Sequence, residues 1–199
     1  MSKERIQGVR EKEYKGIKYR STLEADTAKV LDTLGIPFSY ESRKIVLLDG
    51  FRCPYQKDKV IAITYKPDFN IGHLMLECKG FETPEWKLKK KMLFKYLMTN
   101  EPDTVYLQTH DAKKSLIEAL DPYLKELGFT VSVTTKKKVD RKGWTGTEVG
   151  FFDSIQDAME QLGLNGKPKG SIMRSLCEDA YVYGYKWKLI KDNNEQLPN

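Results

Sequence analysis

The spacing of apolar residues along this chain predicts one helix first and then a group of strands. Ser21 and Glu24 open the helical stretch in the pattern of a capping box, and Gly35 closes it. Between them, apolar residues recur at helical spacing: Leu23, Val30, Leu31 and Leu34. The sequence therefore predicts a helix that begins at Ser21 and stops before Gly35.

Three strands are predicted after this helix. Phe38 to Leu48 holds an apolar run and is followed by the turn dipeptide Asp49-Gly50. The second strand is predicted over Val60 to Phe69 and the third over His73 to Lys79. Because only Asn70-Ile71-Gly72 separates these two strands, we expect them to form an antiparallel hairpin.

Helices and strands alternate in the next part of the chain. Thr83-Pro84-Glu85 supplies a cap, a proline in the first turn and an acidic residue, which predicts a helix to about Thr99. The chain then predicts a strand at Val105 to Gln108, a helix at Asp111 to Leu127 with a break at Pro122, and a strand at Phe129 to Val133. The order helix, three strands, helix, strand, helix, strand indicates an α/β fold with helices packed on a mixed sheet.

Composition shifts after this region, which predicts a second module. Residues 136–149 are basic and rich in glycine, so they are predicted as a linker. The full division is an N-terminal arm (1–15), an α/β domain (16–135), the linker (136–149), a small module (150–192) and a tail (193–199). Within the module we expect helices at Phe152 to Leu164 and Ser171 to Cys177, and a strand at Tyr181 to Ile190.

Overall composition excludes several classes of protein and favours a folded domain with an anionic partner. The chain has 199 residues, of which 40% are hydrophobic and 31% charged, a balance typical of a folded domain. Its net charge of +6 favours nucleic acid or another anionic partner. Three cysteines without C-x-x-C spacing and two histidines argue against a disulfide framework and a zinc site. Neither a membrane span nor a signal peptide is recognisable, so we expect a cytoplasmic protein without a membrane partner.

Strand alternation brings charged residues together on the third predicted strand. Leu74, Leu76 and Cys78 share one face, whereas Glu77 and Lys79 share the other. The hairpin returns Asp68 to the same edge of the sheet. Two carboxylates and one ammonium therefore converge. Carboxylate oxygens suit Mg²⁺ or Mn²⁺, which polarise phosphate oxygens and activate water, and Lys79 could orient that water or neutralise charge in the transition state. The simpler alternative is an exposed ion pair on a half-solvated strand.

The combination of Pro67-Asp68 with Glu77-Cys78-Lys79 resembles the signature of PD-(D/E)XK nucleases. The stretch from Ile63 to Thr83 is similar to small phage endonucleases related to Holliday-junction resolvases, and the likeness extends over about residues 14–133. This resemblance implies a restriction-endonuclease-like core and a Mg²⁺ site in which Mn²⁺ can substitute. It also implies that Glu24 completes the metal site with Asp68 and Glu77. A capping role with Ser21 would by itself explain Glu24 equally well.

The helix that follows this site is rich in lysine. Five of its residues are Lys87, Lys89, Lys90, Lys91 and Lys95, while Leu88, Met92 and Leu97 can face the core. Like charges at this spacing disfavour a helix, and an anionic partner would relieve the repulsion. We expect Lys87, Lys90, Lys91 and Lys95 to contact a DNA backbone. A solvated lysine face is the alternative. His73 and His110 are not predicted to be catalytic.

The C-terminal segment, about residues 149–190, resembles the modular DNA-binding repeats attached to phage and homing nucleases. The likeness rests on Gly150 to Ala158, Leu162-Gly163-Leu164 and Gly184 to Trp187. It implies a small helical DNA-binding module in which Lys169 and Arg174 contact DNA. The alternative is a helical cap that stabilises the catalytic domain, with Tyr185 and Trp187 in its core.

The sequence thus predicts a Mg²⁺-dependent DNA endonuclease, encoded by a phage and active in the host cytoplasm if the resemblance holds. An alternative is a resolvase of Holliday junctions or branched DNA, for which a homodimer is expected because two strands must be cut symmetrically. An alternative of a different class is a DNA-binding protein that keeps a nuclease-like scaffold and does not cut.

Overall fold

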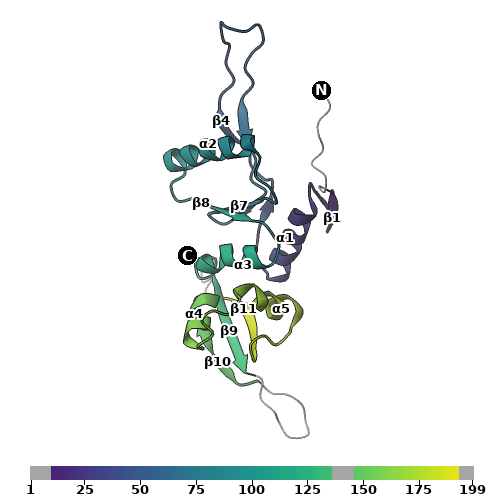
Figure 1. Cartoon of the computed structure of the whole chain (residues 1–199), viewed down its shortest axis with the longest axis vertical. Helices are drawn as coiled ribbons and strands as arrows, with labels where there is room; N and C mark the ends of the chain where they lie inside the picture. Colours follow the sequence, from purple (N-terminus) through teal and green to yellow (C-terminus); the bar gives the residue numbers. More distant parts are fainter. Residues whose placement is uncertain (1–9, 136–145, 193–199) are drawn as a thin grey trace, which may run out of the picture. The chain divides into compact units, whose positions relative to one another are not determined.

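The computed structural model describes residues 10–135 and 146–192. The chain forms two compact units, one of residues 37–110 and the other of the described residues of 1–36 and 111–199 (Figure 1). Sequence analysis instead divided the chain at residues 136–149. The difference arises because strands on both sides of that segment pair in one sheet.

A mixed four-stranded sheet is the centre of the 37–110 unit. Its strands are β3 (Ser39–Tyr40), β6 (Phe69–Ile71), β7 (Leu74–Cys78) and β8 (Val105–Thr109), in the spatial order β3-β6-β7-β8. The predicted hairpin is confirmed: β6 and β7 are antiparallel, with Phe69 opposite Leu76 and Ile71 opposite Leu74. Strand β8 runs parallel to β7, which makes the sheet mixed as predicted.

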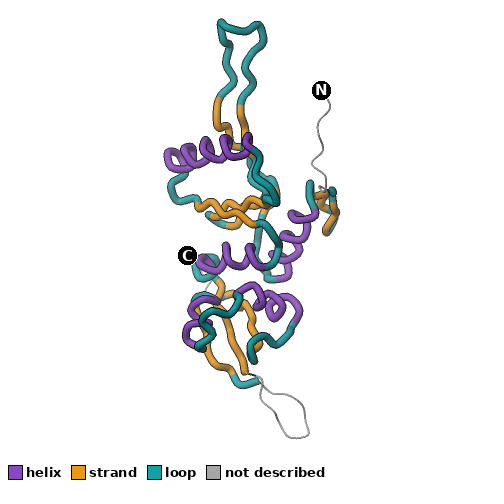
Figure 2. Tube along the Cα trace, in the orientation of Figure 1, coloured by secondary structure: helices purple, strands orange, loops and turns teal. Residues whose placement is uncertain are grey.

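The first two predicted strands are each split in two. Strands β4 (Ile45–Leu48) and β5 (Ile63–Tyr65) leave the sheet and pair with each other as a long two-stranded arm (Figures 1 and 2). An isolated antiparallel bridge between Phe51 and Val60 shows that the pairing continues beyond Asp49-Gly50, where a turn was predicted. Pro67 lies between β5 and β6, and because proline has no N–H to donate, it favours a break in the ladder there.

Helix α2 (Pro84–Asn100) covers one face of this sheet. Its N-cap is the predicted one, Thr83, whose side chain accepts a hydrogen bond from the Trp86 amide. The residues that α2 turns inward are Trp86, Leu93 and Leu97, which form one apolar cluster with Ile45, Tyr65 and Met75. The prediction that Leu88 faces the core was wrong, since its side chain is 62% exposed.

The N-terminal part of the other unit is a hairpin followed by a capped helix. Strands β1 (Lys12–Tyr14) and β2 (Ile17–Tyr19) are antiparallel. The prediction of an N-terminal arm over residues 1–15 was therefore wrong for Lys12 to Tyr14, which form a strand. Residues 1–9 lie outside the described part. Helix α1 (Thr22–Thr33) begins after Ser21 and ends before Gly35, as predicted. The buried ring of Tyr19 and the buried side chains of Ala28 and Leu31 belong to the core of this unit.

The C-terminal part of this unit is built on a three-stranded antiparallel sheet. Its strands are β9 (Phe129–Thr135), β10 (Glu148–Phe152) and β11 (Tyr185–Lys191), with β9 in the middle. Sequence analysis assigned Phe129 to Val133 to the sheet of the candidate site, and that assignment was wrong. Glu148 and Val149, predicted as linker, belong to β10. Residues 136–145 and the tail at 193–199 lie outside the described part.

Short helices accompany this sheet. They are α3 (Lys114–Leu120), the 3-10 turn η1 (Asp121–Tyr123), α4 (Ile155–Gln161), η2 (Lys169–Ile172) and α5 (Met173–Glu178). Asp121 connects η1 to α4, because its buried carboxylate accepts hydrogen bonds from the amides of Ile155 and Gln156 at the start of α4. The alternative in which Tyr185 and Trp187 belong to the core predicted that both are buried. Trp187 is fully buried, and Tyr185 is half-buried. Of the helices described, none has the length and apolar character needed to cross a membrane.

Candidate active site

Asp68 and Glu77 are placed side by side by the β6–β7 hairpin. Asp68 immediately precedes β6, and continuing the register beyond Phe69 and Leu76 sets it opposite Glu77. The Asp68 side chain is fixed by a hydrogen bond of 2.8 Å from the backbone N–H of Cys78 to its Oδ2. Opposed residues of an antiparallel pair project from the same face of the sheet. The predicted convergence of these two carboxylates is therefore consistent with the strand register.

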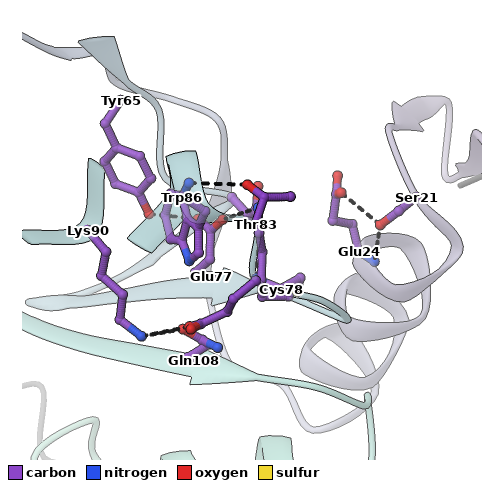
Figure 3. A network of polar contacts seen from close by, with 12 residues as sticks. Ser21, Glu24, Tyr65, Glu77, Cys78, Thr83, Trp86, Lys90 and Gln108 are labelled. Atoms are coloured by element: carbon purple, nitrogen blue, oxygen red, sulfur yellow. Dashed lines mark hydrogen bonds and ion pairs between the residues drawn. The ribbon is translucent and has the colours of Figure 1, made fainter. Parts of the chain in front are cut away.

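Glu77 is buried, and this overturns the alternative of an exposed ion pair on a half-solvated strand. Its residue exposure is only 5%, and every residue of β7 is buried. The Tyr65 hydroxyl donates a 2.7 Å hydrogen bond to Oε2 of Glu77 (Figure 3). Burial and the neighbouring negative charge of Glu77 raise the pKa of Tyr65 far above its usual value, so Tyr65 remains a donor.

Lys79 lies on the same face as Glu77, as strand alternation predicted. Its Nζ atom is 3.6 Å from Oε1 of Glu77, and its side chain is 28% exposed. The backbone N–H of Lys79 donates to the carbonyl oxygen of Thr109 at the end of β8. Nδ1 of His110 lies 2.5 Å from the carbonyl oxygen of Lys79. Contacts with Thr109 at the end of β8 and with the adjacent His110 thus fix the backbone of Lys79.

An aromatic wall from α2 and β5 borders this group. The ammonium of Lys79 lies 4.4 Å from the ring centroid of Trp86. The rings of Trp86 and Tyr65 are in turn 5.7 Å apart between centroids. Trp86 belongs to the first turn of α2, so the start of this helix is packed directly on the charged pair. Tyr65 and Trp86 were not among the predicted site residues, since neither residue belongs to the motif and only the tertiary fold brings them to it.

Glu24 has a defined local role in the other compact unit. The Glu24 amide donates to the Ser21 hydroxyl oxygen, and this hydroxyl donates back to Oε1 of Glu24 at 2.7 Å (Figure 3). Oε2 of Glu24 accepts from the amide of Arg20. The carboxylate therefore caps the start of α1, as the capping-box pattern predicted. Its expected role as a metal ligand remains a prediction.

The lysines of α2 separate into two groups. Lys87, Lys91 and Lys95 are exposed on the outer side of the helix. Lys90 is turned inward, where its ammonium donates to Oε1 of Glu82 at 2.9 Å and to Oε1 of Gln108 at 2.8 Å (Figure 3). The same ammonium lies over the ring of Tyr106. Lys90 thus fastens α2 to β8, which is a structural function distinct from the expected contact with DNA.

Lys169 and Arg174, the two residues of the C-terminal segment predicted to contact DNA, also differ in their exposure. Lys169 is mostly buried, and its ammonium lies 2.6 Å from Oδ2 of Asp121. Arg174 on α5 is exposed and makes a loose contact of 3.8 Å with Glu178, one helical turn away. Of this pair, Arg174 is available to an external partner, whereas Lys169 compensates a buried carboxylate.

The donor chemistry of Asp68 and Glu77 suits a hard divalent cation. In the described residues, no group of three or more His, Cys, Asp or Glu side chains is gathered as a ready-made metal cage. Mg²⁺ is ordinarily held by one or two carboxylates and completes its shell with water and substrate phosphate. Two carboxylates on adjacent strands, with a lysine ammonium beside them, fit such a partial shell.

Comparison of the chain with protein-family models, with curated proteins and with solved structures found no match in any of the three.

Proposed function

We propose that this chain is a Mg²⁺-dependent DNA endonuclease of the PD-(D/E)XK type, which hydrolyses phosphodiester bonds. The observation that carries the proposal is the buried Glu77, held by Tyr65, with the Lys79 ammonium 3.6 Å away and Asp68 on the neighbouring strand. Removing a carboxylate from water is costly unless partners compensate it. A fold that buries Glu77 beside a partly exposed lysine supports a functional use for both.

Each residue has a role in this proposal. Asp68 and Glu77 would hold Mg²⁺, with Mn²⁺ able to substitute. The bound ion supplies a Lewis acid for the phosphate and lowers the pKa of a coordinated water. Lys79 places a positive charge where negative charge develops on the phosphate oxygens during attack. Because Asp68 is fixed by a backbone amide and Glu77 by Tyr65, both carboxylates are oriented before substrate arrives.

DNA is the substrate that the surface near this site supports. Lys87, Lys91 and Lys95 extend along the exposed side of α2, whose first turn packs on Lys79. Phosphate contacts by such lysines dominate the affinity of nucleases for DNA and position the duplex without reading its sequence. Lys90 does not take part in this surface, because its ammonium is bound to Glu82 and Gln108.

Cleavage of a DNA panel tests the proposal. Supercoiled plasmid, linear duplex and a four-way junction are incubated with the protein in Mg²⁺ and in excess chelator. We expect cutting only with metal, and Asp68→Asn should abolish it. Asp103→Asn, at an exposed aspartate of the same unit, is the matched control and should cut normally. Cutting that persists in chelator or in Asp68→Asn contradicts the proposal.

The substrate panel also separates the alternatives. Preference for the junction, together with a dimer in solution, supports branch resolution, because two strands must be cut symmetrically. DNA binding without any cleavage in Mg²⁺ or Mn²⁺ supports a non-cleaving DNA-binding protein.

Glu24 is proposed as a third metal ligand, and a matched pair of variants tests this role. Ser21→Ala removes the hydroxyl partner of the cap but keeps the carboxylate, whereas Glu24→Gln keeps most of the shape and removes the charge. A capping role alone predicts that both variants lose stability and that both cut normally once folded. Loss of cleavage in Glu24→Gln but not in Ser21→Ala supports the role as a ligand.

A further inference from the structure

Trp86 combines two features that packing alone does not explain. Its ring is buried in the cluster beneath α2, yet its indole Nε1 has no hydrogen-bond partner among the described residues. A buried N–H without a partner is costly, and an apolar side chain such as leucine or phenylalanine would avoid that cost. A compensating interaction that depends on the indole is therefore expected. The observed candidate is the Lys79 ammonium over its ring, 4.4 Å from the centroid.

The geometry of Lys79 agrees with a pull toward this ring. Two other lysine ion pairs among the described residues are tighter: Lys169 lies 2.6 Å from Asp121, and Lys90 lies 2.9 Å from Glu82. The Lys79 ammonium lies 3.6 Å from Oε1 of Glu77, although Lys79 directly follows β7 and is on the same face as Glu77. An indole is the strongest aromatic partner for a cation, and the interaction strengthens when the pair is partly desolvated. The Trp86 ring thus attracts the Lys79 ammonium, which would otherwise lie closer to the Glu77 carboxylate.

We infer that Trp86 is a positioning residue, which holds the Lys79 ammonium over its ring and away from closer contact with Glu77. This inference rests on the proposed function. The consequence for the reaction is twofold. Glu77 keeps its carboxylate available to a metal ion, and Lys79 keeps its charge directed at the phosphate. Since Trp86 belongs to the first turn of α2, the helix that carries the exposed lysines also sets the position of Lys79.

Two substitutions at position 86 differ in whether an aromatic ring remains. Trp86→Phe keeps an aromatic face, whereas Trp86→Leu keeps an apolar side chain and removes the ring. We expect Trp86→Leu to lower kcat on the order of tenfold with little change in KM, and Trp86→Phe to restore most of the loss. Leu97→Ala is the packing control, since it removes buried volume from the same helix without touching Lys79. It should lower stability and leave kcat per folded molecule unchanged.

A double-mutant cycle tests whether Trp86 acts through Lys79. In a Lys79→Ala background, Trp86→Leu should cause no further loss of cleavage, because its effect requires the ammonium. Additive losses in the cycle overturn the inference, as does a Trp86→Leu variant that cuts at the rate of the unaltered protein.

A measurement without DNA keeps the inference separate from the proposed function. In proton–carbon NMR spectra of the full chain, the Lys79 ε-methylene signal is identified by its loss in Lys79→Ala. We expect this signal to be shifted upfield by the ring current of Trp86, to stay shifted in Trp86→Phe, and to return to the ordinary lysine position in Trp86→Leu. An unshifted signal in the unaltered protein overturns the inference even if the protein cuts DNA. A shifted signal in a protein that cuts no DNA instead contradicts the proposed function.

Discussion

The hydroxyl of Tyr65 lies 2.7 Å from Oε2 of Glu77, and both side chains are buried. A hydrogen bond from a neutral donor to a carboxylate is stronger than one between two neutral groups. In this position it also compensates part of the cost of removing Glu77 from water. The bond therefore links the stability of the 37–110 unit to the orientation of a candidate metal ligand.

Removing the Tyr65 hydroxyl should destabilise the protein. In Tyr65→Phe the buried carboxylate of Glu77 loses the hydrogen bond from the Tyr65 hydroxyl, which costs about 1–3 kcal/mol of unfolding free energy. Urea denaturation followed by circular dichroism measures the change. Tyr55→Phe is the matched control, because the same atom is removed from a side chain that is 94% exposed. Equal stabilities of the two variants would contradict the assigned role of the bond.

Tyr65, which is buried, and Tyr106, which is half-buried, also predict how stability depends on alkaline pH. Burial, with the negative charge of Glu77, raises the pKa of both Tyr65 and Tyr106 above the ordinary value of 10.0. A group with a raised pKa in the folded state contributes its stability fully below the unfolded value, and loses it as pH rises above that value. We expect the unfolding free energy to fall above about pH 10, by up to ~1.4 kcal/mol per pH unit for each such tyrosine. Urea titrations at several alkaline pH values measure this slope, and Tyr106→Phe should reduce it.

Local pattern was sufficient to predict the charged group of the candidate site. Two-residue alternation placed Glu77 and Lys79 on one face, and the short connection to the preceding strand returned Asp68 beside them. The cap at Thr83 likewise fixed the start of α2. These features depend on neighbours in sequence, where the steric and hydrogen-bonding preferences of the chain act directly.

Long-range pairing was not predictable in the same way. The β-branched residues near Val131 indicate a strand but do not specify its partners, and β9 pairs with β10 and β11 in place of the sheet of the candidate site. Lys90 was counted with the exposed lysines because it lies beside them in the sequence of the helix. Its inward position depends on Gln108, which a different element supplies. Burial of a lysine is decided by such distant partners, so helical periodicity alone does not reveal it.

Lys169 should behave as a structural residue and not as a contact to DNA. Its ammonium lies 2.6 Å from a carboxylate of Asp121 that is almost fully buried. Lys169→Met leaves this charge without its cation, which is expected to cost roughly 3 kcal/mol of unfolding free energy. Denaturant titration checks the loss, and Lys167→Met, at an exposed neighbouring lysine, should be near neutral. A stable Lys169→Met protein with weakened DNA binding would restore the original expectation.

The exposed lysines of α2 should determine the salt dependence of DNA binding. Lys91 and Lys95 are exposed, whereas Lys90 is bound to Glu82 and Gln108. If each exposed lysine neutralises one phosphate, Lys91→Gln and Lys95→Gln should each reduce the slope of log Kd against log salt by about 0.9. Fluorescence anisotropy with the Asp68→Asn protein measures binding without cleavage.

The third member of this series is Lys90→Gln. Because it removes an internal ion pair, it should lower the stability of the protein and leave the salt slope of the folded fraction unchanged. Identical slopes for all three variants would show that this side of α2 does not contact DNA.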